Sequence, residues 1–252
     1  MEEKRIRPRL DDPLYQVEEY VPEFLPNGKP DLAKITFFLQ NLALDHVKKL
    51  GLGEDYQREK SFLYVVCRMR GVFLHPIHPG EKLTGVTYTL TPNLIDMTRY
   101  AYLLNEKDEP LFFLTSLWIL LDPKTRRIKP ARFYRDDLLK ILPQVKEKKK
   151  IEGTDLSALD FSSLSFGQEE KYVVQPQDID ANKHMNNTAY LRISQNDSSF
   201  KNITSYEINF EKECFLNETL SLTKCDNNNE EDILGTKENG ELSFKLKFLG
   251  ER

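Results

Sequence analysis

The sequence predicts an α+β fold, because one long helical pattern is followed by several strand-like segments and this order occurs twice along the chain. Apolar residues recur at helical spacing over residues 34–50, and Gly51 follows as a C-terminal cap. Runs of β-branched and aromatic residues, separated by polar turns, then indicate strands at residues 62–74, 82–90, 98–104 and 111–121. One helix followed by an antiparallel meander makes an α+β domain.

The composition changes after Pro130, and the order of elements then starts again. A short amphipathic segment ends at Pro143, and a lysine-rich and then serine-rich stretch follows it. We interpret this stretch as a connection between domains. The second copy has a helix from Asn187 and strands at residues 205–213, 218–224, 231–236 and 241–248. The predicted boundaries are an N-terminal domain at residues 1–142, a linker at 143–170 and a C-terminal domain at 171–252.

Length and composition argue against several classes of protein. A chain of 252 residues with a formal net charge of −4 is unsuited to general nucleic-acid binding, which needs a basic face. Three cysteines, Cys67, Cys214 and Cys225, cannot all pair and suit neither a metal site nor a disulfide framework, so a reducing, cytoplasmic setting is expected. Residues 1–9 lack the apolar core of a signal peptide, and no apolar run approaches the ~20 residues of a membrane span.

The most informative segment is DIDANKHMNN at residues 178–187. It places four polar side chains at every second position: Asp178, Asp180, Asn182 and His184. In an extended segment all four would point to one face. A helix then starts, with an asparagine from the end of the segment as its cap. Carboxylate, amide and imidazole groups are thus brought to a helix N-terminus, whose free N–H groups can bind an oxygen that becomes negative during reaction. This arrangement suits the transfer of an acyl group to water.

Other interpretations of the segment were compared with this one. A turn rich in Asp and Asn that only caps a helix occurs in many proteins without any chemistry. A calcium-binding EF-hand loop is excluded, because Lys183 stands where a glycine is needed and Ala189 where a bidentate glutamate is needed. A segment with one histidine and no cysteine offers too few of the usual ligands for a zinc site.

The segment DIDANKHMNN, with Tyr190 after it, resembles the catalytic segment of the plant and bacterial acyl-acyl carrier protein thioesterases. Three more segments resemble the same family and follow its order, at residues 42–52, 116–127 and 210–214. The resemblance implies two tandem hotdog domains, each an antiparallel sheet wrapped around a long helix. It also implies hydrolysis of fatty acyl-acyl carrier protein to free fatty acid and holo-carrier protein, which terminates fatty acid synthesis, without a metal or dissociable cofactor.

The two copies differ at the positions that carry chemistry. When they are superposed, Asn27 falls at the position of Asn182, but a leucine replaces Asp180 and a lysine replaces His184. The first copy therefore lacks both the carboxylate and the imidazole. We expect the N-terminal domain to bind the acyl chain with a degenerate site, and the C-terminal domain to catalyse.

Four residues are the candidate catalytic set. His184 can accept and return a proton close to neutral pH. Glu213 matches the family's catalytic glutamate, and we assign it jointly with His184 to the activation of water. Asn182 is assigned to positioning or to contact with the oxyanion. Asp180 either orients the site or attacks the thioester itself, in which case a covalent acyl-enzyme forms.

Three further features have competing interpretations. Cys214 is either an alternative nucleophile or a small apolar side chain in a strand, where alternation would put it on the face opposite Glu213. His46 lies on the apolar stripe of the first helix, which favours a core histidine over a catalytic one. A basic cluster is either a solvated surface or a docking surface for the acidic carrier protein. It consists of Arg126, Arg127, Lys129 and Arg132.

Two alternative functions remain open at this stage. An acyl-CoA thioesterase would use the same chemistry with different docking. A non-catalytic acyl-binding or sensing hotdog protein would hold the acyl group without turnover. The preferred partner is acyl carrier protein with its phosphopantetheine-linked acyl chain, and a homodimer is also compatible with the sequence.

Overall fold

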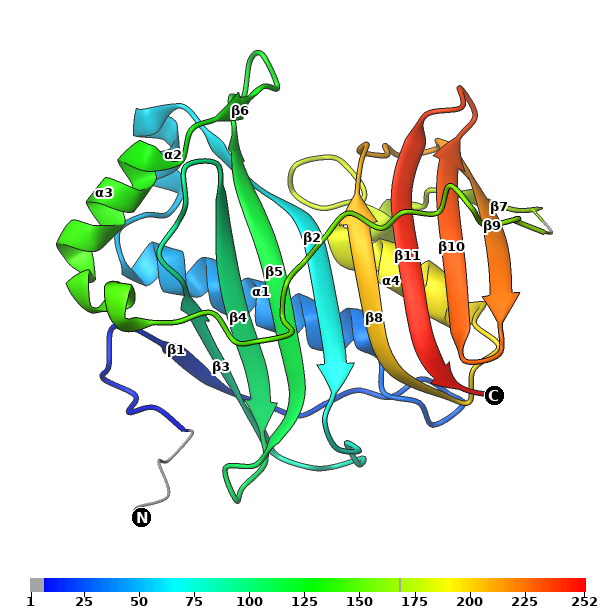
Figure 1. Cartoon of the computed structure of the whole chain (residues 1–252), viewed down its shortest axis with the longest axis horizontal. Coiled ribbons are helices and arrows are strands. Elements are labelled where there is room, and N and C mark those ends of the chain that lie inside the picture. The colour runs from blue at the N-terminus through cyan, green and yellow to red at the C-terminus, as the bar shows by residue number, and fades with distance from the viewer. Residues whose placement is uncertain (1–6, 168) are drawn as a thin grey trace.

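The computed structural model describes residues 7–167 and 169–252, and these form one continuous antiparallel sheet that curves around two helices (Figure 1). The N-terminal half consists of β1 (Gln16–Tyr20), α1 (Leu32–Lys49), α2 (Glu54–Lys60), β2 (Leu63–Phe73), β3 (Leu83–Thr89), β4 (Asp96–Leu104), β5 (Pro110–Leu121), β6 (Ile128–Lys129), α3 (Arg132–Ile141) and the 3-10 helix η1 (Pro143–Glu147). The C-terminal half consists of β7 (Glu169–Val173), the 3-10 helix η2 (Pro176–Asp178), α4 (Asn187–Asn196), β8 (Asn202–Phe210), β9 (Thr219–Asn227), β10 (Glu230–Lys237) and β11 (Leu242–Glu251).

Helix α1 forms where its apolar periodicity predicts it. The side chain of Asp31 accepts a hydrogen bond from the backbone N–H of Lys34 (3.0 Å) and so caps the first turn. Leu32, Ile35, Leu39 and Leu42 share the buried face and are at most 1% exposed. Burial of this stripe against the sheet holds the helix in place, because propensity alone stabilises an isolated helix only weakly.

The sheet has the same plan on both sides of its middle. Its strand order is β1-β3-β4-β5-β2-β8-β11-β10-β9-β7, with the short β6 paired to β5. In this order β1 corresponds to β7, β3 to β9, β4 to β10, β5 to β11 and β2 to β8. The halves meet where β2 pairs antiparallel with β8, with Met69 opposite Ile208. A pseudo-twofold axis therefore relates two hotdog domains in tandem, which confirms the expected α+β architecture.

Close packing joins the two halves at this junction. A Cβ atom on Gly71 would lie 2.3 Å from the Tyr206 ring and 2.6 Å from Phe112, so only glycine fits under these rings. The hydroxyl of the buried Tyr206 lies 2.6 Å from Oγ1 of Thr36 on α1. A strand of the C-terminal half is thereby tied to the helix of the N-terminal half.

The connection between the halves crosses the sheet on the side away from α1 and α4 (Figure 1). Residues 148–167 contain no helix or strand. The segment is attached through its backbone, since Leu156 accepts a hydrogen bond from Arg68 (3.2 Å) and the Leu159 N–H donates to Asn209 (3.0 Å). The proposed domain boundaries stay a prediction. In the described residues, no helix is long and apolar enough to cross a membrane, and residues 1–6 of the charged N-terminal segment lie outside these residues.

Candidate active site

The segment at residues 178–187 forms a tight turn, so the predicted extended run with four side chains on one face is wrong. The N–H of Asp180 donates to the carbonyl of His184 (3.0 Å), and the N–H of Lys183 donates to the carbonyl of Asp180 (3.0 Å). Lys183 closes the turn in the left-handed region, with φ of 68°. Turn closure, rather than strand alternation, brings Asp180 and His184 together.

Asp178 supports the turn and is not part of the group of side chains around His184. Its side chain is buried, and it accepts hydrogen bonds from the Tyr172 hydroxyl (2.7 Å) and the Gln175 N–H (2.7 Å). It also forms an ion pair with Arg192 on α4. Asp178 therefore anchors the start of the turn to β7 and to the helix that follows.

The imidazole of His184 lies between two carboxylates. Its Nδ1 is 3.7 Å from Oδ2 of Asp180, and its Nε2 is 3.5 Å from Oε1 of Glu213. The side chains of these three residues are between 21% and 34% exposed, so solvent and a substrate can reach them. The arrangement combines a proton carrier with two acceptors and is suited to activating a water molecule.

Glu213 reaches His184 from an irregular segment, which corrects the prediction of a strand through residue 213. Strand β8 ends at Phe210. The chain then runs beside the turn at residues 178–187, where Phe215 forms a β-bridge with His184 and the Met185 N–H donates to the carbonyl of Cys214 (2.7 Å). These backbone contacts fix the segment that carries Glu213.

Asn182 and Asn186 hold the turn and the start of α4. The backbone N–H of Asn182 donates to Oδ1 of Asp180 (2.8 Å), and its side-chain nitrogen lies 3.5 Å from Oδ2. Asn186 is the N-cap of α4, and its Oδ1 accepts from the Thr188 N–H (2.9 Å). The turn at residues 178–187 thus leads directly into the positive end of a helix dipole.

Arg126 comes from the N-terminal half and contacts the site. It lies in the turn between β5 and β6 with φ of 58°, and it forms an ion pair with Oε1 of Glu213. The same carboxylate oxygen therefore faces Arg126 and His184. The sequence had suggested Arg126 only as part of a docking surface.

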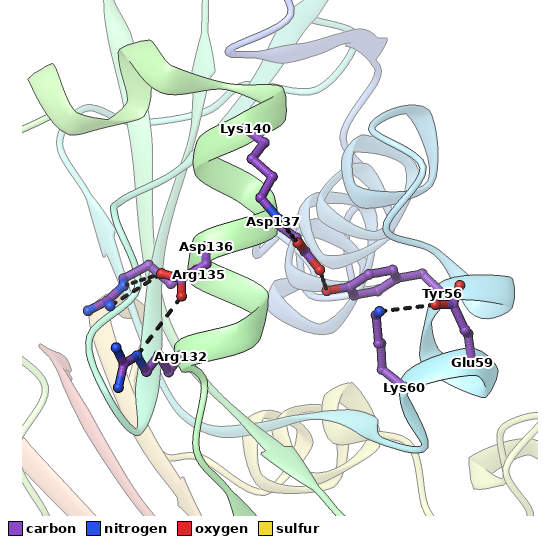
Figure 2. Close-up of polar contacts among 8 residues, drawn as sticks. All are labelled: Tyr56, Glu59, Lys60, Arg132, Arg135, Asp136, Asp137 and Lys140. Atoms are coloured by element: carbon purple, nitrogen blue, oxygen red, sulfur yellow. Dashed lines mark hydrogen bonds and ion pairs between the residues drawn. The ribbon is translucent and has the colours of Figure 1, made fainter.

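Of the other members of the basic cluster, Lys129 contacts the end of α2 and Arg132 belongs to α3. The Lys129 ammonium donates to the carbonyls of Lys60 (3.0 Å) and Ser61 (2.9 Å). Arg132 lies 4.0 Å from Asp136 on its own helix (Figure 2), and Arg127 is exposed. The docking role of this cluster stays a prediction.

Cys214 is buried beside the site rather than presented to it. Its side chain is 0% exposed, and its Sγ lies 3.1 Å from Oγ of Ser243. Burial raises the pKa of the Cys214 thiol, which disfavours the thiolate that a nucleophile needs. These observations favour the interpretation as a small buried side chain.

A cavity in the N-terminal half lies between α1 and the sheet. It is lined by Ala43, Leu44, Val47, Tyr64, Thr89, Met97, Arg99, Trp118 and Tyr134. Sequence analysis overlooked Arg99, whose guanidinium is buried and donates to Nδ1 of His46 (3.1 Å) and Oγ1 of Thr87 (3.3 Å). Burial lowers the pKa of His46 to about 3, so this histidine is neutral. It is part of the buried core, as the sequence favoured.

The equivalent turn of the first copy has the same backbone and different side chains. Phe24 and Pro30 form the β-bridge that Ile179 and Met185 form in the second copy. The Leu25 N–H donates to the carbonyl of Lys29 (2.8 Å), as the Asp180 N–H does to His184. Leucine and lysine therefore occupy the places of the acid and the imidazole.

A tandem hotdog fold with an imidazole between two carboxylates at a helix N-terminus is the architecture of a hotdog thioester hydrolase. Two family models match the chain: the acyl-ACP thioesterase N-terminal domain over residues 14–141 and the acyl-ACP thioesterase C-terminal domain over residues 162–245. The chain belongs to the acyl-ACP thioesterase family, whose members hydrolyse fatty acyl-acyl carrier protein (acyl-ACP).

Solved structures agree with this family. An acyl-ACP thioesterase from Bacteroides thetaiotaomicron superposes with a TM-score of 0.81 at 17% identity, covering 93% of this chain and 97% of that chain. The 12:0-ACP thioesterase from Umbellularia californica gives a TM-score of 0.75 at 17% identity, covering 94% of this chain and 96% of that chain. At these identities the likeness establishes the fold. No curated protein matches the sequence.

Proposed function

We propose that the enzyme hydrolyses acyl-ACP with His184 and Glu213 acting as one proton-transfer pair. The observation that carries this proposal is the 3.5 Å separation of His184 Nε2 from Glu213 Oε1 at the start of α4. Water held by this pair attacks the thioester carbonyl carbon, and its proton passes to the pair. When the carbon–sulfur bond breaks, the pair gives the proton to the departing pantetheine sulfur. The products are the free acid and the carrier thiol.

In this mechanism Asp180 orients the imidazole and does not attack. Its Oδ1 accepts from the Asn182 N–H (2.8 Å), and its Oδ2 faces His184 Nδ1 at 3.7 Å. Both oxygens thus have partners in the turn. Hydrolysis in ¹⁸O-labelled water separates the two roles: an orienting Asp180 gains no label after many turnovers, whereas label in its carboxylate would establish the acyl-enzyme.

The acyl chain is assigned to the N-terminal half, where mainly apolar and aromatic side chains line a small cavity between α1 and the sheet, and these side chains must move apart to admit it. Carrier docking is assigned to the exposed basic residues of the cluster, chiefly Arg127 and Arg132, because the carrier protein is acidic. Reversing both charges should raise the KM for acyl-ACP and leave the KM for acyl-pantetheine unchanged. Equal effects on both substrates would remove the docking assignment. A cytoplasmic location belongs to the same proposal.

The experiment that tests the function compares free fatty acid release from matched acyl-ACP and acyl-CoA substrates across chain lengths, with His184→Ala beside the wild type. Carrier-selective release that is lost in the variant supports the proposal. Preference for CoA would favour the acyl-CoA thioesterase. Tight acyl binding without release would favour a sensing protein.

A further inference from the structure

Lys237, at the end of β10, binds the segment that carries Glu213. Its ammonium lies 2.9 Å from Oε2 of Glu218 and donates to the backbone carbonyl of Glu213 (3.2 Å). It also lies 5.6 Å from the centre of the Phe215 ring. The side chain of Lys237 is 12% exposed. One largely buried cation therefore contacts three residues of the irregular segment between β8 and β9.

The charge of Lys237 is maintained by its carboxylate partner. Burial by itself would lower the pKa of the Lys237 ammonium, but the hydrogen bond to Glu218 and the charge of that carboxylate raise it above its ordinary value. Glu218 is held in turn, because its Oε2 also accepts a hydrogen bond from the Phe215 N–H (2.9 Å). Lysine, carboxylate and backbone therefore form one connected set of charge-assisted hydrogen bonds.

The first copy of the repeat closes the same loop without a cation. Oε2 of Glu81 accepts from the His78 N–H (3.0 Å), as Oε2 of Glu218 accepts from Phe215. Over residues 7–167 and 169–252, Glu81 takes part in no ion pair. The loop thus forms without a lysine, so a role in building the loop does not explain Lys237.

The register of the strands shows which residue of the first copy corresponds to this lysine. Three residues after the loop glutamate, Thr84 pairs with Leu104 in the first copy, and Ser221 pairs with Thr236 in the second. The next residue along the strand is Asn105 in the first copy and the lysine in the second. Oδ1 of Asn105 accepts from two backbone N–H groups of its own turn. The cation therefore stands in the copy that carries the candidate site.

We propose that Lys237 is a positioning residue for the reaction, which fixes the main chain of Glu213 so that its carboxylate meets His184. The carboxylate itself is held by Arg126, so two separate cations hold the main chain and the side chain of one residue. A misplacement of about 1 Å can lower a reaction rate by about 10²-fold. This inference rests on the proposed function, because it takes the pair of His184 and Glu213 as the reacting centre.

The test uses Lys237→Met, which keeps the apolar stem and removes the cation, with Lys224→Met as the matched control. Lys224 also binds a carboxylate and a backbone carbonyl, both of Asp197 at the end of α4, and its side chain is 21% exposed. We expect Lys237→Met to lower kcat on acyl-ACP by about 10- to 100-fold with KM little changed. Lys237→Arg, which keeps the charge, should recover most of this loss, and Lys224→Met should keep kcat. Equal kcat in the two methionine variants would overturn the inference.

A double-mutant cycle with Glu213→Gln shows whether the lysine acts through this glutamate. If it does, Lys237→Met lowers the rate by about 10- to 100-fold in the wild-type background and changes it little in the Glu213→Gln background. Losses of the same size in both backgrounds would overturn the inference, because the lysine would then act on the fold as a whole or on another group. Failure of both Lys237→Met and Lys237→Arg to fold would overturn it as well.

Amide hydrogen exchange separates this inference from the proposed function, because it requires no hydrolysis. The Phe215 N–H bonds to Glu218, and the Met185 N–H bonds to the carbonyl of Cys214. Both N–H groups should exchange about 10-fold faster or more in Lys237→Met and at the wild-type rate in Lys224→Met. Unchanged exchange in Lys237→Met would overturn the inference even if hydrolysis were confirmed. Absence of hydrolysis in the wild type would remove the proposed function, while faster exchange would still show that the lysine holds this segment.

Discussion

Nε2 of His184 lies 3.5 Å from Oε1 of Glu213, although helix α4 and strand β8 separate the two residues along the chain. The β-bridge between His184 and Phe215 holds this pair together. Glu213→Gln should lower kcat on acyl-ACP by roughly 10²–10⁴-fold, because an amide cannot accept the proton of water. Steady-state kinetics with a melting curve measure this. Retention of most of the activity would remove Glu213 from the pair.

Arg126 should act through Glu213 and not through substrate binding. Its ion pair fixes the carboxylate that faces His184, so Arg126→Met is expected to lower kcat by about 10- to 100-fold with little change in KM. The neighbouring exposed Arg127 provides the control. Arg127→Met should change KM for acyl-ACP if it docks the carrier and should leave kcat alone. A raised KM in Arg126→Met and a lowered kcat in Arg127→Met would show that Arg126 docks the carrier and that Arg127 acts at the site.

Cys214→Ser should keep hydrolysis within about threefold of the wild type, since the thiol is buried against Ser243 and its pKa is raised by burial. Alkylation of the native enzyme provides an independent check: Cys214 should react with a thiol reagent only when the protein unfolds. Complete loss of activity in a folded Cys214→Ser protein would restore the cysteine as nucleophile.

Asp232 should make stability depend on pH. Burial raises the pKa of its carboxyl from 3.8 to about 6, and Lys247 lies 3.6 Å from it. A raised pKa favours the folded state while the group is protonated in both states, and this contribution is lost as pH rises from about 4 to about 6. Asp232→Asn should therefore raise the free energy of unfolding at pH 8 by on the order of 1–3 kcal/mol and change it little below pH 4.

Denaturant unfolding at both pH values measures this effect, with Asp226→Asn as the control. Asp226 is half exposed and pairs with Arg252 at 3.3 Å, so its replacement should change stability little at either pH. A destabilised Asp232→Asn protein at pH 8 would show that the charged carboxylate is favourable where it lies.

The sequence predicts those elements whose burial leaves a periodic pattern. Helix α1 begins and ends within two residues of its predicted bounds, because its apolar stripe and its flanking Gly51 are both visible in the sequence. Helix α2 was not predicted, since it has only seven residues and none of them is buried. Strand β1 was also overlooked, because an edge strand with two adjacent glutamates shows no apolar alternation.

The candidate site was predictable in its residues and not in its geometry. Asp180, Asn182, His184 and Glu213 were chosen from a motif, but the left-handed conformation of Lys183 that closes the turn has no sequence signal, since lysine rarely adopts it. The pair between Arg126 and Glu213 joins residues of different domains, and only the packing of the halves reveals it.

The most direct test of the central claim is a double-mutant cycle on single-turnover hydrolysis of acyl-ACP, with wild type, His184→Ala, Glu213→Gln and the double variant. If the two residues act as one proton-transfer pair, each single variant loses most of the rate, and the double variant is no slower than the slower single one. Losses that add fully in the double variant would contradict the account, because they would mean that His184 and Glu213 act independently.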